Sequence, residues 1–289
     1  EDMVRASSIN VDAVKIIEGS ANVTQLPDIF TRALSISLNK KNGVDYLDSF
    51  DGWWADLHDC KEKIPFSIPK LNYVTENGFA RKTLNVLIAA TGRGKSAAMV
   101  SLGCDYIRRG LNVLYVTLEL SEHQITTRAN ANILDVDMSE IKLIDREVLK
   151  NKWLEFLKLR PGKLRIQEFP TSQITTLQIR TLLKELKQKE GFAPDVMFVD
   201  YINLLNPARA LKGAQSYYTV KAIAEELRGI AVEHDLCCVT ATQTTRAGLD
   251  LEELSLSDTS ESIGLPFTVD FMLGMSQSDE HRDANMIMC

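Results

Sequence analysis

Residues 88–96 read IAATGRGKS and end in a triplet suited to binding phosphate. Gly92 and Gly94 allow backbone N–H groups to wrap a phosphate, and a helix opening at Lys95 would add the positive end of its dipole. We expect Lys95 to reach the β- and γ-phosphates of ATP and the Ser96 hydroxyl to ligate Mg²⁺. The residues expected to contact the nucleotide are Ala90, Thr91, Gly92, Arg93, Gly94, Lys95, Ser96 and Ala97.

The phosphate-loop motif usually begins with a glycine five residues before the position of Gly94. In this chain that position is Ala89. This position lies at the end of a predicted strand, before the turn tightens, so a methyl group is physically tolerable. The alternative to a phosphate loop is a plain glycine-rich turn. The succession of strand, turn, GKS and helix favours the phosphate loop.

Other polar residues directly follow, or end, apolar runs. Glu119 follows VLYVTL and is suited to activating the water that attacks the γ-phosphate. Asp200 ends DVMFVD and fits the acidic residue that holds magnesium together with Ser96. Gln243 ends CCVTATQ and is placed to sense the γ-phosphate. The structural alternatives are a helix-terminal carboxylate, a strand cap and an exposed loop amide. We assign Glu119, Lys95 and Gln243 as the catalytic set.

These side chains converge only if strands and helices bring them together. Short apolar runs predict strands at 84–90, 112–118, 163–169, 195–202, 237–243 and 269–275, and NMIMC at the end is a possible seventh strand. Helical patterns alternate with them at 95–109, 122–133, 147–159, 175–190 and 217–234. This alternation predicts an α/β fold with a mostly parallel sheet covered on both faces. In such sheets ligands bind beyond the carboxyl ends of the strands.

Two loops at that edge carry basic residues. Residues 203–216 contain Arg209 and Lys212 and no acid, and residues 244–250 contain Arg246. Positive groups on adjacent loops can hold the backbone of single-stranded DNA without reading its sequence. The alternative is a pair of solvated, flexible loops.

Composition and charge limit which class of protein this can be. The chain has 289 residues and a net charge of −6, so a nucleic-acid partner is not indicated by bulk charge, and DNA binding should depend on several weak loops acting together in an assembly. No apolar run reaches the roughly 18 residues of a membrane span. The five cysteines form no zinc or disulfide framework, which favours the cytoplasm.

An amphipathic segment precedes the predicted sheet. Residues 26–40 open with Leu26-Pro27-Asp28, which suits a helix start, and continue as an apolar stripe. The spacing alone does not distinguish a helix packed on its own domain from one docked on a neighbouring subunit.

Several motifs occur in order and together resemble one family. They are AATGRGKS, LYVTLELSEHQITTR, VMFVDYINLL, SYYTVKAIAEELRGIAVE, VTATQTTR and SDTSESIGLPFTVDFML. Over roughly residues 26–289 the chain resembles the RecA-like, P-loop ATPase domain of hexameric replicative DNA helicases of the DnaB type. The resemblance is closest to the primase-associated helicases of T-even phages, which implies the cytoplasm of the host cell.

The resemblance implies roles for particular residues. Glu119 falls on the family's catalytic glutamate, Asp200 on its magnesium aspartate and Gln243 on its glutamine switch. The DNA-binding loops fall on 203–216 and 244–257. Further positions that match the family's polar residues are Arg128, Asp258 and Glu261.

The resemblance also implies a domain organisation. Residues 1–25 would be the tail of an N-terminal collar domain, 26–40 a linker helix docked on the adjacent subunit, and 41–289 the ATPase domain. The family's arginine finger would lie beyond Cys289, so we expect this chain to bind Mg-ATP but to hydrolyse it weakly.

The implied function is ATP-driven translocation on single-stranded DNA and duplex unwinding by a homohexameric ring, with a primase and a helicase loader as partners. A RecA-like recombinase filament and a nucleotide-gated binding module are the alternatives. The linker-like helix and the LELSEHQ stretch favour the helicase.

Overall fold

The computed structural model describes residues 46–47, 49–58, 63–171, 173–209, 216–244 and 265–276. The chain divides into two compact units, Glu1–Cys60 and Lys61–Cys289. In the first unit the described helix is α3, Phe50–His58. The predicted collar tail and linker helix lie outside the described residues, so these domain assignments remain predictions. The second unit holds the predicted sheet and the candidate site.

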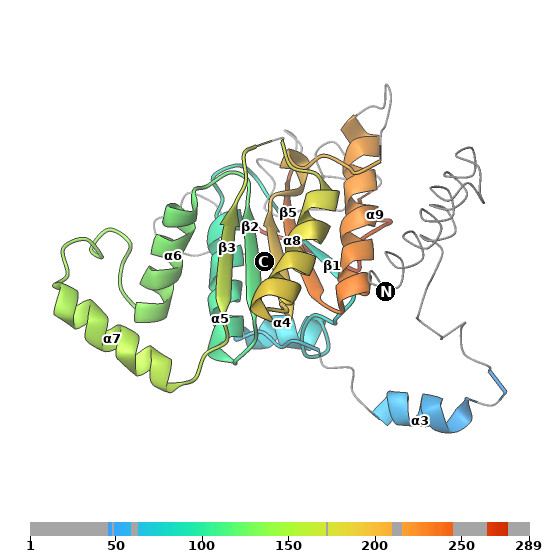
Figure 1. Ribbon diagram of the computed structural model, residues 1–289, viewed down its shortest axis with the longest axis horizontal. Coiled ribbons are helices and arrows are strands. Elements are labelled where there is room, and N and C mark those ends of the chain that lie inside the picture. Colours follow the sequence, from blue (N-terminus) through green and yellow to red (C-terminus); the bar gives the residue numbers. More distant parts are fainter. Residues whose placement is uncertain are drawn as a thin grey trace, which may run out of the picture. The chain divides into compact units, whose positions relative to one another are not determined.

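The second unit is built on a six-stranded sheet with the order β3-β2-β4-β5-β1-β6 (Figure 1). Every neighbouring pair of these strands is parallel. The strands are β1 Leu84–Ala89, β2 Val113–Thr117, β3 Leu164–Glu168, β4 Val196–Asp200, β5 Cys237–Gln243 and β6 Phe271–Gly274. The predicted parallel α/β sheet is confirmed, and the possible seventh strand lies outside the described residues.

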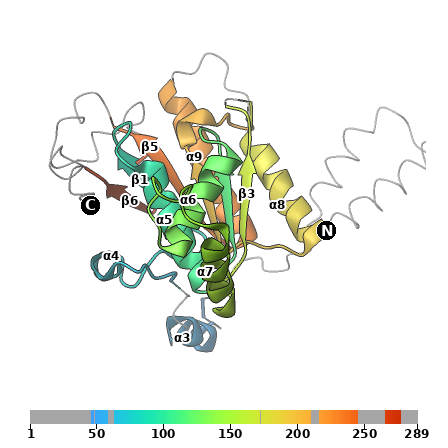
Figure 2. The ribbon, with the colours of Figure 1, turned by 90° about the vertical axis from the view of Figure 1, so that its left-hand side faces the viewer.

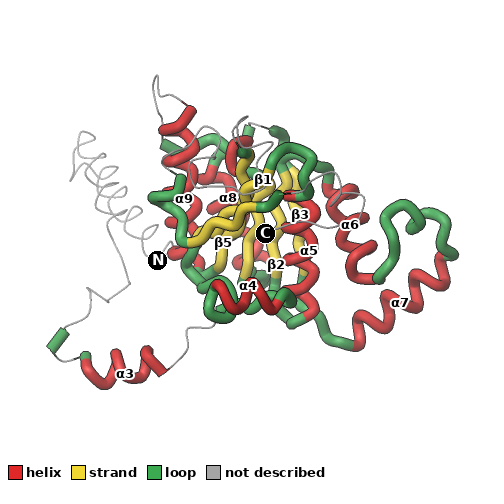
Figure 3. Tube along the Cα trace, turned by 180° about the vertical axis from the view of Figure 1, so that it is seen from behind, coloured by secondary structure: helices red, strands yellow, loops and turns green. Residues whose placement is uncertain are grey.

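Helices cover both faces of this sheet (Figures 2 and 3). They are α4 Pro69–Val74, α5 Lys95–Arg108, α6 Glu122–Leu134, α7 Arg146–Lys158, α8 Thr176–Glu190 and α9 Ser216–His234, with a short 3₁₀ turn at Ile202–Leu204. The five helices predicted from the sequence are all present, and α4 was not predicted.

Two cores separate the faces of the sheet. The first packs α8 and α9 against one side of the strands, and the second packs α4, α5 and α6 against the other. Because both faces are covered, β1, β2 and β4 are buried at every position. That burial explains why these strands are continuous apolar runs in the sequence. No helix in the described part of the chain is both long and apolar enough to cross a membrane.

Capping residues fix where two helices begin. Ser121 and Gln124 form a capping box at the start of α6, and Thr175 and Gln178 form one at the start of α8. Each box satisfies backbone donors that the first helical turn leaves unpaired. Both helices begin shortly after a strand ends, α6 after β2 and α8 after β3, so they start near the carboxyl edge of the sheet.

Gly162, just before β3, lies against the backbone of Leu111, so a substitution there tests this packing. A methyl group there would lie 1.9 Å from the carbonyl oxygen of Leu111, and the Gly162 N–H donates to the carbonyl of Ile107 at 2.8 Å. We expect Gly162→Ala to lower the free energy of unfolding by about 3 kcal/mol in urea titrations followed by circular dichroism.

The matched control is Gly229→Ala in α9, where an added methyl group meets nothing within 4 Å. This change should stabilise the chain by up to about 1 kcal/mol through helix propensity. Equal effects of the two changes would contradict the packing described at Gly162.

Candidate nucleotide-binding site

The phosphate loop joins the end of β1 to the start of α5. Gly92 has φ 75° and Gly94 has φ 86°, so both occupy the left-handed region that favours glycine. Gly94 is the N-cap of α5 and offers no side chain to pair with the helix's first N–H groups. These donors and the helix dipole are left for an anion, as the sequence predicts.

Lys95 is folded back onto the loop. Its side chain is buried, and Nζ donates to the carbonyl oxygens of Ala89 and Ala90, each at 3.0 Å. Burial lowers the pKa of Lys95, while the carboxylates of Glu119 and Asp200 act in the opposite direction. The lysine is therefore a buried cation near two acids, held by groups that a phosphate can replace.

Ala89 is fully buried at the end of β1, and its carbonyl is one of the two that hold Lys95. The methyl group fits within the sheet's core, on the face that packs against α5. The expectation that alanine is tolerable at this position of the loop is consistent with that packing.

The strand register places the other polar residues at the same edge. Asp200 pairs with Thr117 across β4 and β2, and Gln243 pairs with Ala89 across β5 and β1. Glu119 follows β2 by two positions and is exposed. The predicted catalytic and magnesium residues are thus brought to the carboxyl ends of four neighbouring strands.

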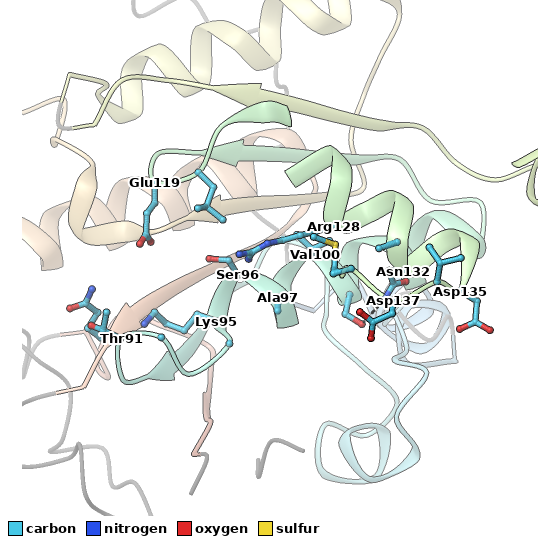
Figure 4. Close-up of a pocket in the computed structure, with 18 residues that line it drawn as sticks. Thr91, Lys95, Ser96, Ala97, Val100, Glu119, Arg128, Asn132, Asp135 and Asp137 are labelled. Carbon is cyan, nitrogen blue, oxygen red and sulfur yellow. Dashed lines mark hydrogen bonds between the residues drawn. The ribbon is translucent and has the colours of Figure 1, made fainter. Parts of the chain in front are cut away.

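A cavity of about 850 Å³ opens at this edge (Figure 4). The phosphate loop forms one wall, and Glu119, Arg128 and Gln243 also line the cavity. The Glu119 carboxylate is directed toward the part of the cavity where Thr91 and Lys95 lie (Figure 4). Arg128, which the family resemblance singled out, therefore lines the same cavity from α6.

Asp200 is fully buried at the end of β4 and is not among the residues that line this cavity. Its Oδ2 accepts a hydrogen bond from the hydroxyl of Tyr115 at 2.8 Å, and its Oδ1 has no hydrogen-bond partner among the described residues. Burial, followed by the charge of Asp200, raises the pKa of Tyr115, so the phenol stays protonated and donates.

The donor set fits a nucleotide-bound magnesium ion. Among the described residues, no cluster of three or more histidine, cysteine or acidic side chains suits a metal. Magnesium at phosphate sites typically uses one or two protein oxygens together with phosphates and water. If the magnesium role predicted from the sequence holds, the unpartnered Oδ1 of Asp200 would supply one such oxygen and the Ser96 hydroxyl on the cavity wall another.

Hydrogen bonds link the ends of β4 and β5. The amide of Gln243 donates to the hydroxyl of Tyr201 at 3.0 Å, and Thr242 Oγ1 donates to Asn203 Oδ1 at 3.0 Å. In the sequence, these four residues stand at the start of, or just before, the two segments that are expected to bind DNA.

Of the predicted DNA-binding residues, Arg209 is described. Its guanidinium forms an ion pair with Glu225 at 2.5 Å, and its backbone N–H donates to the Glu226 carboxylate at 3.2 Å. The second oxygen of Glu226 accepts the Ala208 N–H at 2.8 Å. Lys212, Arg246, Asp258 and Glu261 lie outside the described residues. The roles of these residues remain predictions.

Tyr115 and Tyr201 were missed by reasoning from the sequence. Each sits inside an apolar motif, VLYVTL or DVMFVDYI, and reads there as a packing residue. A buried tyrosine hydroxyl usually finds a hydrogen-bond partner, so the position of Tyr115 within a predicted buried strand was an available signal. Tyr201 follows β4 and is only partly buried, so this signal does not apply to it.

The sheet order, the loop and the residues at the strand ends define the RecA-like class of P-loop ATPase folds. Within that class, the chain belongs to the family of the DnaB-like helicase C terminal domain, whose profile matches residues 64–283. The matched range begins close to the start of the second compact unit and includes the whole described sheet.

Relatives and solved structures agree with this assignment. The chain is 38% identical over 265 residues to the DnaB-like replicative helicase of Enterobacteria phage T4, covering 90% of this chain and 55% of the relative. It is 25% identical over 214 residues to the replicative DNA helicase DnaB of Helicobacter pylori (strain ATCC 700392 / 26695), covering 73% and 43%. The chain thus spans about half the length of these curated relatives.

Two solved structures share the fold. One is described as an ATPase domain and has a TM-score of 0.69 at 16% identity, covering 84% of this chain and 87% of its own. A structure of a DnaB-like replicative helicase, described together with its interactions with primase, has a TM-score of 0.71 at 17% identity and covers 96% and 67%.

The position of Lys95 gives a direct test of the loop. We expect Lys95→Ala to weaken binding of a fluorescent ATP analogue by about 100-fold, because charged hydrogen bonds to the phosphates are lost. Lys152 provides a matched control, since its Nζ also donates to two backbone carbonyls, those of Leu134 and Asp135, at 2.9 and 3.2 Å. Lys152→Ala should leave the affinity unchanged, and normal affinity in Lys95→Ala would exclude the loop as the site.

Proposed function

We propose that this chain is the motor domain of a replicative DNA helicase, which couples ATP hydrolysis to translocation on single-stranded DNA and to duplex unwinding. The observation that carries the proposal is the convergence of Lys95, Glu119, Asp200 and Gln243 at one edge of the sheet, where Lys95, Glu119 and Gln243 line one cavity. Membership of the DnaB-like helicase family favours this function over a recombinase filament or a binding module.

In this proposal, different residues bind the phosphates, hold magnesium and activate the attacking water. The N–H groups of the loop and the start of α5 bind the phosphates, and Lys95 exchanges the carbonyls of Ala89 and Ala90 for phosphate oxygens. Ser96 and Asp200 would hold Mg²⁺, which would neutralise phosphate charge. Glu119, exposed on the cavity wall, orients the attacking water and accepts its proton.

Gln243 connects the nucleotide to the DNA loops in this proposal. Its amide donates to the Tyr201 hydroxyl in this structure. A γ-phosphate in the cavity offers this amide a charged acceptor, and turning toward it would release Tyr201. Because Gln243 ends β5 and Tyr201 follows β4, the exchange acts where the loops 203–216 and 244–257 leave the sheet.

The partners follow from the same proposal. Single-stranded DNA would bind the basic loops, and a homohexameric ring would sum their weak contacts. A primase and a helicase loader are proposed partners, and the solved DnaB-like helicase described with primase supports the first of these. The similarity to a phage T4 helicase supports action in the cytoplasm of an infected host cell.

Replacing Glu119 separates nucleotide binding from turnover. We expect Glu119→Gln to lower the already weak ATP turnover of this chain further, by about 10²–10⁴-fold, with little change in affinity, because the amide cannot accept the proton. Steady-state phosphate release and binding of a fluorescent analogue measure the two quantities. Asp135→Asn, which changes another carboxylate lining the cavity, should alter neither. Normal turnover in Glu119→Gln would remove the glutamate from the mechanism.

The DNA loops are tested by the salt dependence of binding. Changing Arg209, Lys212 and Arg246 to alanine should weaken single-strand binding and reduce the slope of log affinity against log salt concentration by about 2. The control changes Lys184, Lys187 and Lys189, which are exposed on the C-terminal half of α8, near the opposite edge of the sheet. An unchanged slope in the loop variant would place DNA elsewhere.

A further inference from the structure

We propose that Tyr115 is a positioning residue for Asp200: its hydroxyl holds Oδ2 and thereby leaves Oδ1 as the oxygen available to a nucleotide-bound cation or to that cation's water. The contact is direct, at 2.8 Å, and both side chains lie in the core. The inference deepens the proposed function, because it rests on the magnesium role of Asp200.

The strand register makes this contact possible. Strands β2 and β4 pair so that Tyr115 is opposite Phe198 and Thr117 is opposite Asp200. Alternate residues of a strand share a face, so the Tyr115 side chain lies on the same face as Asp200, one step back along the sheet. A long side chain is needed to span that step, and tyrosine supplies both the length and a donor at its tip.

The tyrosine ring is held rigidly. It stacks on Phe198 with ring centroids 5.7 Å apart and an interplanar angle of 22°, and the residue is 1% exposed. No bulk water reaches the hydroxyl to compete for its proton. The donor therefore has a fixed position relative to β4, which is the requirement for orienting a neighbouring group.

The carboxylate needs such an anchor. A buried carboxylate with unsatisfied oxygens is costly, and its terminal torsion is broad, so it turns toward any nearby donor or charge. The cation of Lys95 interacts electrostatically with Asp200 from the same edge of the sheet. The Tyr115 hydrogen bond opposes rotation of the carboxylate toward the lysine and so keeps one oxygen unpaired.

Tyr106 offers a matched control in the same core. It is fully buried and stacks on the same Phe198 ring, with centroids 6.2 Å apart and an interplanar angle of 25°. Its hydroxyl has no hydrogen-bond partner among the described residues. Tyr106→Phe therefore removes the same atom from the same packing environment without touching Asp200.

The experiment measures affinity for a non-hydrolysable fluorescent ATP analogue, in EDTA and across a Mg²⁺ titration, using the 289-residue chain. Tyr115→Phe should bind the analogue in EDTA as tightly as the unmodified chain does. The increase in affinity on adding Mg²⁺ should be about tenfold smaller in this variant. Tyr106→Phe should match the unmodified chain in both conditions. Tyr115→Met, which is apolar and cannot donate, is measured in parallel and should behave like Tyr115→Phe.

Asp200→Asn separates this inference from the function on which it rests. It should abolish the Mg²⁺-dependent gain, and adding Tyr115→Phe to it should cause no further loss. If Asp200→Asn loses the gain but Tyr115→Phe and Tyr115→Met retain it, the positioning role is overturned and the proposed function stands.

Two other outcomes also overturn the inference. If both Tyr115 variants weaken binding equally in EDTA and in Mg²⁺, the tyrosine supports the fold or the loop and does not position Asp200. If Asp200→Asn retains the Mg²⁺-dependent gain, the proposed magnesium role of Asp200 fails first, and the role of Tyr115 fails with it.

Discussion

The parallel register of β2, β4, β5 and β1 is the constraint on which the rest of the structure depends. It aligns Thr117 with Asp200 and Ala89 with Gln243, so residues far apart in the sequence end their strands at one edge. The order of these strands in the sheet places Asp200, at the end of β4, between the strand leading to Glu119 and the strand ending in Gln243. A shift of one residue in either pairing would turn these side chains to the opposite face of the sheet.

Burial of opposite charges at this edge prepares it for a phosphate. Lys95 and Asp200 are both buried, yet the lysine is held by two backbone carbonyls and the aspartate by one phenol. Neither group is fully satisfied by the other, and one oxygen of Asp200 has no hydrogen-bond partner among the described residues. In the proposed function, magnesium and triphosphate together would supply the missing partners, which is a physical reason for the two to bind as a unit.

The sequence predicts the elements well because both faces of the sheet are covered. Full burial makes β1, β2 and β4 continuous apolar runs, and the polar residue that ends or follows such a run marks the functional edge, as at Asp200 and Glu119. Contacts between segments that are far apart in the chain leave no such pattern in the sequence. Tyr115 and Tyr201 act through their hydroxyls, which reach Asp200 and Gln243 only after the strands pair. Likewise, nothing in the sequence indicates that Glu225 and Glu226 of α9 hold Arg209.

In the proposed function, four strand ends form one site for magnesium nucleotide. The structure of this chain with Mg²⁺ and a non-hydrolysable ATP analogue would show whether they do. We expect triphosphate on residues 90–97, Lys95 Nζ moved from the carbonyls of Ala89 and Ala90 onto phosphate oxygens, and Tyr115 still bound to Asp200 Oδ2. Nucleotide bound elsewhere, or a Lys95 that stays on those carbonyls with the nucleotide present, would contradict it.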